Sequence, residues 1–143
     1  GVVLHPGSHV GSGEEVGIQR VIDGLNRVLE MTAGLKPLIL LETTAGQGTN
    51  LGAAFWHLRR MIDGVTAPER VAVCVDTCHI FAAGYELRTA EGYAATMDDF
   101  DQTLGIDLIK AIHMNDSIGD LGSRKDRHAH IGHGQIGLDG FRN

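Results

Sequence analysis

The sequence predicts an α/β fold in which amphipathic helices cover a parallel β-sheet. Three observations support this fold class. Short apolar runs alternate with longer amphipathic segments over all 143 residues. The run at residues 71–75 is continuously apolar, as in a strand that is buried on both faces. The runs also recur at intervals of roughly 36 residues, which is enough chain for one crossover helix between parallel strands.

The first unit consists of a predicted strand at residues 2–4 and a helix within residues 11–34. Ser12 and Glu15 have the S-x-x-E spacing of a capping box, so we expect Ser12 to cap the start of this helix. Its apolar residues recur at helical spacing: Val21, Ile22, Leu25, Val28 and Leu29. We therefore expect that face to pack on the sheet.

The later units repeat this order. Residues 38–41 form the second predicted strand, and the helix after it ends at residues 63–64, with apolar positions at Leu51, Phe55, Leu58 and Ile62. Residues 71–75 form the third strand, and the helix after it stops at Gly105, with a stripe at Tyr93, Met97, Phe100 and Leu104. Residues 108–112 form the fourth strand. Four strand–helix units fill the chain, and a (β/α)8 barrel needs about twice this length.

Composition places the chain among globular proteins. It has 43% hydrophobic and 21% charged residues, and its formal net charge is −6. These values exclude a disordered tail, and no apolar run approaches the ~18 residues of a membrane span. An acidic chain also argues against a protein that coats nucleic acid, unless bound cations reverse the charge locally. Because we find no linker or low-complexity stretch, we expect one domain or part of one.

The chain ends and the cysteines carry two further expectations. The chain opens inside an apolar run, without a secretory signal peptide, and stops just after a helix-start pattern, so we expect a piece of a longer protein. Cys74 and Cys78 are too few and too close together for a secreted disulfide framework. This favours a reducing, cytoplasmic setting.

Each predicted strand ends at a residue that can bind a metal ion: His5, Glu42, Asp76 and His113. The carboxyl ends of parallel strands form one rim, so we expect two imidazoles and two carboxylates to converge in one pocket. These are ligand types suited to zinc or a similar divalent ion. Any one of them alone is more often a helix cap or a paired polar group, but four strand ends out of four are hard to obtain by accident.

Three more candidate ligands follow on loops. His79 lies three residues after Asp76, and Asp126 and His128 flank Arg127. Residues i and i+2 of an extended chain point to the same side, so Asp126 and His128 could hold one ion. Seven candidate ligands exceed one tetrahedral site, which indicates two or three metals with a bridging carboxylate.

Other polar residues near these ligands have more than one interpretation. Four are candidate nucleic-acid contacts: His9, Arg124, Lys125 and Arg127. The basic residues could instead be solvated, and the glycine-rich segment at residues 43–48 could be a tight turn or approach phosphate. We expect Cys78 to pack in the interior. For three further histidines we predict no role in the site: His57, His130 and His133.

Five sequence blocks resemble the endonuclease IV family, the zinc-dependent class II apurinic/apyrimidinic (AP) endonucleases. They are LHPGSH at 4–9, LLETTAGQG at 40–48, VCVDTCHIFAAGYEL at 73–87, IHMNDS at 112–117 and GSRKDRHAHIGHGQIG at 122–137. The resemblance implies a (β/α)8 TIM barrel with three metal ions at its carboxyl rim. Residues 1–143 would then be part of a single barrel domain whose N-terminal and C-terminal strands are missing.

The resemblance also implies a role for each candidate ligand. His5 and Glu42 would bind the first metal, with Glu42 bridging to the second. Asp76 and His113 would bind the second, and the third would be held by His79, Asp126 and His128. The family draws one more His and one more Glu from strands outside this chain, so only the third set is complete here. The implied cofactor is Zn²⁺, three per complete protein, with Mn²⁺ able to replace it at some sites.

The implied activity is that of a hydrolase of base excision repair. It would cleave the phosphodiester 5′ to an abasic site in double-stranded DNA, leaving a 3′-hydroxyl and a 5′-deoxyribose phosphate. Glu42 would be the catalytic residue, because it fixes the metal pair. The complete protein would be a monomer without a membrane partner.

Two alternatives remain open. The first is a metal-dependent sugar isomerase or epimerase on the same barrel, which would use one or two metals and need no third site. The second is a catalytically incomplete fragment. In that case the isolated chain would expose two parallel edge strands, and we expect it to self-associate along them or to be poorly stable.

Overall fold

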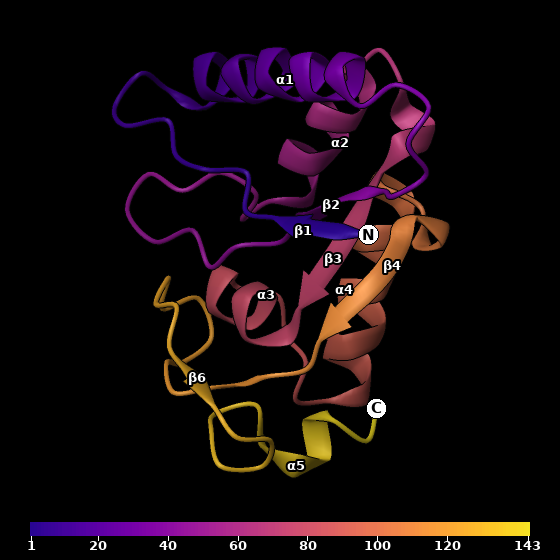
Figure 1. Cartoon of the computed structure of the whole chain (residues 1–143). Coiled ribbons are helices and arrows are strands. Elements are labelled where there is room, and N and C mark those ends of the chain that lie inside the picture. The colour runs from indigo at the N-terminus through magenta and orange to yellow at the C-terminus, as the bar shows by residue number, and fades with distance from the viewer.

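Four parallel strands form the central sheet of the computed structural model, which describes all of residues 1–143 (Figure 1). They lie side by side in chain order: β1 (Val2–Leu4), β2 (Ile39–Glu42), β3 (Val71–Asp76) and β4 (Ile109–His113). Each neighbouring pair is parallel, which confirms the predicted strands and their direction. All four carboxyl ends therefore lie at the same edge of the sheet.

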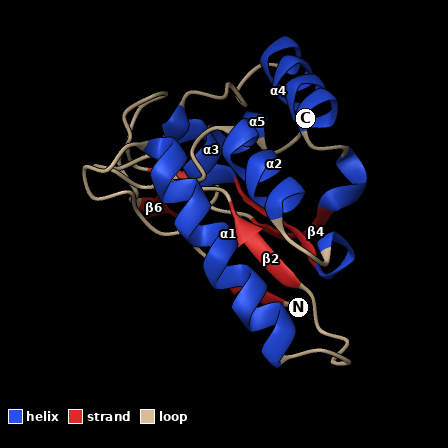
Figure 2. Ribbon diagram, turned by 90° about the horizontal axis from the view of Figure 1, so that it is seen from above, coloured by secondary structure: helices blue, strands red, loops and turns tan.

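Three helices follow the first three strands: α1 (Glu14–Met31), α2 (Phe55–Gly64) and α4 (Ala90–Thr103). A short helix, α3 (Thr77–Ala83), begins directly where β3 ends. Figure 2 shows α1 lying across one face of the sheet beside α2. The alternation of strands and helices agrees with the predicted βα units. No helix is both long and apolar enough to cross a bilayer.

Two predicted helix features are wrong in detail. Gly13, rather than Ser12, is the residue that precedes α1, and it makes no side-chain cap. The Ser12 hydroxyl donates to the His9 carbonyl at 2.7 Å and accepts from the Arg20 guanidinium at 3.1 Å, and the predicted capping box does not form. Leu51 is buried, but α2 begins only at Phe55, so Leu51 belongs to the preceding loop.

The core lies between the helices and one face of the sheet. Its 20 buried residues include the alternate residues Val71, Val73 and Val75 of β3. The predicted helix stripes join it only in part, since Val28 is 46% exposed and Tyr93 and Met97 are half-buried. Burial of one sheet face fixes the register of every strand, because a slip of one residue would turn the apolar side chains outward.

The opposite face of the sheet carries a much smaller apolar cluster. Its buried members are Leu40, Ala72 and Cys74. The edge strands of this sheet are exposed, with Val2 at 62% and Ile112 at 54%. Self-association of the chain along these edges stays a prediction.

The segment after β4 departs from the βα pattern, and sequence reasoning did not predict its form. It contains a two-stranded antiparallel ladder of β5 (Asp116–Ser117) and β6 (His128–Ala129), and then α5 (Gly137–Gly140). The buried Asp116 carboxylate accepts four backbone N–H groups across the turn, from Gly132, Gly134, Ile136 and Gly137, at 2.9–3.2 Å. At Gly134 a Cβ would lie 2.4 Å from the Ser117 carbonyl, so only glycine fits beside this carboxylate.

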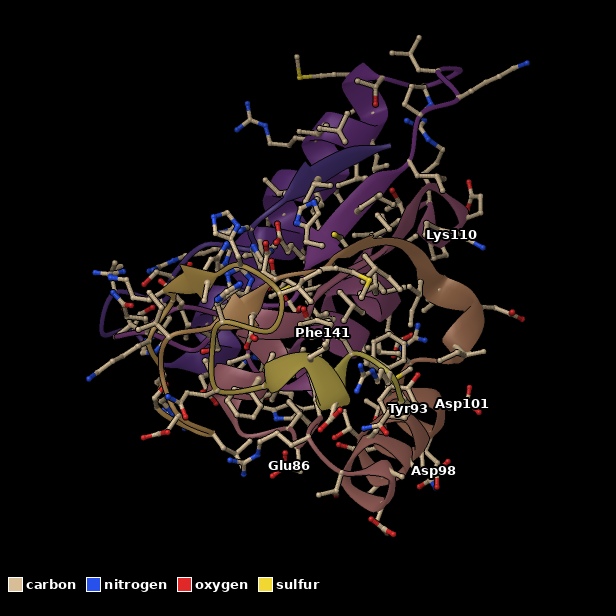
Figure 3. All side chains as sticks on the ribbon, turned by 90° about the horizontal axis from the view of Figure 1, so that it is seen from below. Glu86, Tyr93, Asp98, Asp101, Lys110 and Phe141 are labelled. Atoms are coloured by element: carbon tan, nitrogen blue, oxygen red, sulfur yellow. The ribbon has the colours of Figure 1, made fainter.

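The outer side of α4 is acidic. Its carboxylates are Glu91, Asp98, Asp99 and Asp101, all exposed. Figure 3 shows Asp98 and Asp101 extending from this helix into solvent. On its other side, Tyr93 lines an apolar hollow together with Phe141, which follows α5 (Figure 3).

Candidate metal centre

Glu42 occupies the middle of the candidate centre. One of its carboxylate oxygens, Oε2, lies 3.0 Å from His5 Nε2. The other, Oε1, lies 2.9 Å from His113 Nδ1. The Glu42 side chain is 6% exposed, whereas the two imidazoles are about half exposed. A single buried carboxylate therefore presents its two oxygens to imidazoles from the two edge strands, which is the arrangement that a bridging ligand requires.

Asp76 combines the two roles that the sequence left open for a strand-end carboxylate. Its Oδ1 caps α3 by accepting the His79 backbone N–H at 3.0 Å. Its Oδ2 accepts Asn115 Nδ2 at 2.6 Å and lies 3.9 Å from His113 Nδ1 and 3.8 Å from His128 Nε2. Asp76 thus caps a helix and also faces two candidate ligands. Asn115, which orients this oxygen, was missed because an Asn after a strand is an ordinary turn residue.

The side chains of His79, Asp126 and His128 form a compact triangle, in which each imidazole faces a different oxygen of the Asp126 carboxylate. His79 Nε2 lies 3.2 Å from Asp126 Oδ2, His128 Nε2 lies 3.3 Å from Asp126 Oδ1, and the two Nε2 atoms are 3.3 Å apart. In a tetrahedral zinc site with bonds of about 2.0–2.1 Å, two ligand atoms are separated by about 3.3 Å. The spacing of these three side chains fits one such ion.

A backbone carbonyl fixes which nitrogen of His79 is free. His79 Nδ1 lies 2.8 Å from the Thr43 carbonyl oxygen. Because a carbonyl only accepts, Nδ1 carries the hydrogen, and the lone pair of Nε2 is left facing Asp126 and His128. Histidine ligands of metal ions commonly donate their second N–H in this way. Sequence reasoning missed Thr43, since a backbone carbonyl leaves no signature in the side-chain pattern.

The electrostatics of the centre call for bound cations. Glu42 and Asp76 are both buried, and an ionised carboxylate in such a place needs a neutralising partner. The pKa of the neighbouring Cys74 thiol reflects these two carboxylates. Burial is the main cause that raises this pKa to about 11, and the negative charges of Glu42 and Asp76 raise it further. Imidazole and carboxylate groups are ligands for zinc and related divalent ions, so these residues fit a metal centre in chemistry as well as in spacing.

His57 supports the loops of the centre, although we predicted no partner for it. It is 3% exposed, and its Nδ1 accepts the Gly52 N–H at 3.1 Å. Burial lowers the pKa of His57, and the nearby Glu14 only partly opposes this. A Cβ on Gly52 would lie 3.3 Å from the Glu42 carbonyl oxygen and 3.0 Å from the Pro6 ring. His57 therefore holds the point where the loops after β1 and β2 meet.

The candidate nucleic-acid contacts lie beside the centre. Arg124, Lys125 and Arg127 are exposed on the loop between β5 and β6. Arg124 and the half-buried His9 line one polar hollow of about 330 Å³, which also includes part of the glycine-rich segment 43–48. Gln47 in this segment accepts the Asp126 N–H at 3.2 Å. Gln47 is a further residue that sequence reasoning missed. His130 and His133 are exposed, and no role is assigned to them.

Comparisons with known proteins agree on one family. Residues 1–143 match the family described as xylose isomerase-like TIM barrel. A "probable endonuclease 4" of Chloroflexus aurantiacus is 54% identical over 99% of this chain, and one of Geobacter sulfurreducens is 50% identical over 99%. The crystal structure of endonuclease IV from Thermus thermophilus has a TM-score of 0.81 and 39% identity over 99% of this chain. The chain spans about half the length of these relatives, namely 50%, 48% and 48%.

Proposed function

The chain belongs to the xylose isomerase-like TIM barrel family and, within it, to the endonuclease IV proteins, and from this premise we propose that the complete protein is a metal-dependent DNA repair endonuclease. Its four βα units are then part of the barrel. The substrate we propose is duplex DNA with an abasic site, cleaved on the 5′ side of that site to leave a 3′-hydroxyl and a 5′-deoxyribose phosphate. The proposed cofactor is a cluster of three zinc ions.

The triangle of His79, Asp126 and His128 carries this proposal. Its two imidazole nitrogens are 3.3 Å apart, and each lies 3.2–3.3 Å from one of the two Asp126 oxygens, a spacing that fits one ion. Glu42 forms further candidate groups beside it, one with His5 and His79 and one with His113. A sugar isomerase or epimerase on the same barrel would need only one or two ions. The additional ligand set therefore favours the phosphodiesterase.

The side chains divide the work of the reaction. When bound, divalent ions supply charge neutralisation for the phosphodiester oxygens and acidify water at neutral pH. Glu42 holds its two oxygens toward different imidazoles and would serve as a ligand to two ions. His79, Asp126 and His128 would hold the third. Arg124, Lys125 and Arg127 are placed to bind backbone phosphates, and His9 to face the substrate.

An abasic nucleotide suits such a rim. It has lost the base that stacks in the duplex, so turning it out of the helix costs less than turning out an intact nucleotide. The cations would give the pocket a positive charge in an acidic chain, which resolves the objection that the net charge of −6 raises against nucleic-acid binding. The cytoplasmic location and the assignment of residues 1–143 to one domain stay predictions.

The decisive test is incision of a duplex that contains a single abasic site by the complete protein with Glu42→Gln. We expect at least a ~100-fold loss of incision, because a neutral amide cannot bridge two cations. Mutation of a residue that only hydrogen-bonds to a metal ligand already lowers metal affinity or activity about 10–100-fold. Glu86→Gln is the matched control, since it makes the same carboxylate-to-amide change away from the centre. Wild-type incision by the Glu42 variant would refute the role of this residue.

Metal analysis of the same protein separates the two barrel activities. We expect three divalent ions per complete protein and loss of incision after chelation. One ion per chain, together with ketose–aldose interconversion, would favour the isomerase instead.

A further inference from the structure

One buried nucleophile at the centre has no part in the chemistry proposed above. Cys74 is fully buried, and it lies on the sheet face opposite the main core, with Leu40 and Ala72. It is the register partner of Glu42 on the neighbouring parallel strand, so the two side chains emerge on the same face. The thiol therefore lies beside the Glu42 carboxylate on this face of the sheet.

Three ligand types lie close together at this pair of strands. A carboxylate oxygen of Glu42, Cys74 Sγ and a ring nitrogen of His113 all lie within 4.8 Å of one another. That distance lets a single ion contact all three. His113 is 44% exposed, so a cation can reach the group from the open side of the rim. Oxygen and nitrogen ligands suit zinc and harder ions, whereas sulfur adds affinity for soft ions.

We propose that Glu42, Cys74 and His113 form a binding site for soft divalent cations such as Cd²⁺, which the centre holds through the Cys74 sulfur. The metal–sulfur bond replaces the thiol S–H bond, and the proton passes to solvent. Glu42 and His113 are also ligands of the proposed zinc centre, so Cd²⁺ would displace an ion there. Binding of Cd²⁺ itself does not rest on the nuclease activity, since only these three side chains carry it.

The second cysteine provides an internal comparison. Cys78 is also buried and lies near Asp76 and His128. Its Sγ, however, donates to the Arg127 carbonyl oxygen at 3.6 Å. The Cys78 thiol is therefore engaged in packing, and we assign the soft-ion site to Cys74 alone.

The test adds Cd²⁺ to the complete protein after chelation and records the ultraviolet charge-transfer band of a cadmium–thiolate bond. We expect one equivalent to produce the band in the wild type and in Cys78→Ser, and Cys74→Ser to lose it. His113→Asn should weaken Cd²⁺ binding about 10-fold, as expected for a lost ligand contact. This variant also keeps the test open if Cys74→Ser does not fold, since residue 113 lies on an exposed edge strand.

The outcomes separate the two proposals. A band that persists in Cys74→Ser, or that is lost in Cys78→Ser, would overturn the soft-ion site, as would its absence in the wild type. A cadmium band in a protein that does not cut DNA would leave the site intact and refute only the proposed function.

Discussion

The two halves of the candidate metal centre are supported in different ways. His5, Glu42 and His113 sit at the ends of strands, which are positioned by the sheet ladder and by one apolar face buried under helices. Asp126 and His128 lie on a segment whose paired strands have only two residues each, and the turn beyond them is held by one carboxylate, that of Asp116. A regular scaffold thus supplies one half of the site, whereas the other depends on a two-residue ladder, a contact with Gln47 and the buried Asp116 carboxylate.

The strongest way to break this contrast is Asp116→Ala. Several buried backbone N–H groups would lose their acceptor, so we expect the free energy of unfolding to fall by about 3 kcal/mol in urea denaturation. The His79–Asp126–His128 set should lose its ion first, while the strand-end half keeps its own. Asp116→Asn keeps an acceptor oxygen and should lose less. Equal stability of wild type and Asp116→Ala would contradict the anchoring role.

Acid sensitivity gives a second readout of the same anchor. Burial alone would raise the pKa of Asp116, but the backbone N–H groups of Ser117, Gly134, Ile136 and Gly137 outweigh it and lower that pKa below its ordinary value of 3.8. The stabilisation is therefore complete above about pH 4, and it is lost as the pH falls through the lower folded-state pKa. Asp116→Ala should flatten this part of the stability profile.

The strand-end half is tested by His57→Phe. This change removes the acceptor of the Gly52 N–H, and we expect a loss of about 1–2 kcal/mol in unfolding free energy. Because Gly52 packs on the Glu42 backbone and on Pro6, a divalent ion bound at Glu42 should be lost at a lower chelator concentration, with the His79 set unaffected.

His57→Asn is the matched variant, since its amide oxygen can accept in place of Nδ1, and it should recover part of both losses. If the His79 set loses its ion first in His57→Phe, then the two halves are not supported separately.

The smallest expected effect is that of Glu86→Gln, which lies outside both halves. The Arg88 guanidinium, bound to the Glu86 carboxylate, lowers the pKa of Glu86 to about 2. We expect a loss below about 1 kcal/mol at neutral pH, as for other partly exposed ion pairs. The loss should disappear as the pH falls toward about 2, where the wild-type carboxylate is also protonated. Ion binding should not change, and any change would show that the centre responds to general destabilisation.

The sequence predicted those site residues that lie at the ends of regular β-strands. Apolar runs located Glu42, Asp76 and His113, because a buried strand imposes a pattern on its own residues. Asp116 and His57 were not identified because their partners are backbone N–H groups, which every residue except proline has. The predicted cap at Ser12 was wrong because α1 begins at Glu14, which places Gly13 rather than Ser12 at the cap position. Side-chain patterns predict the sheet and its rim, whereas contacts with loop backbone require coordinates.

The acidic outer side of α4 also affects how the molecule meets other molecules. Asp98 and Asp101 extend from that side in Figure 3, while the loop with Arg124 and Lys125 lies at the other end of the molecule, beside β6 in Figure 1. The acidic side of α4 repels an approaching polyanion, and the basic loop attracts it. The polyanion is therefore steered electrostatically toward the rim before it makes contact. Since added salt screens such fields over roughly 10 Å at 0.1 M, this orientation is strongest in dilute buffer.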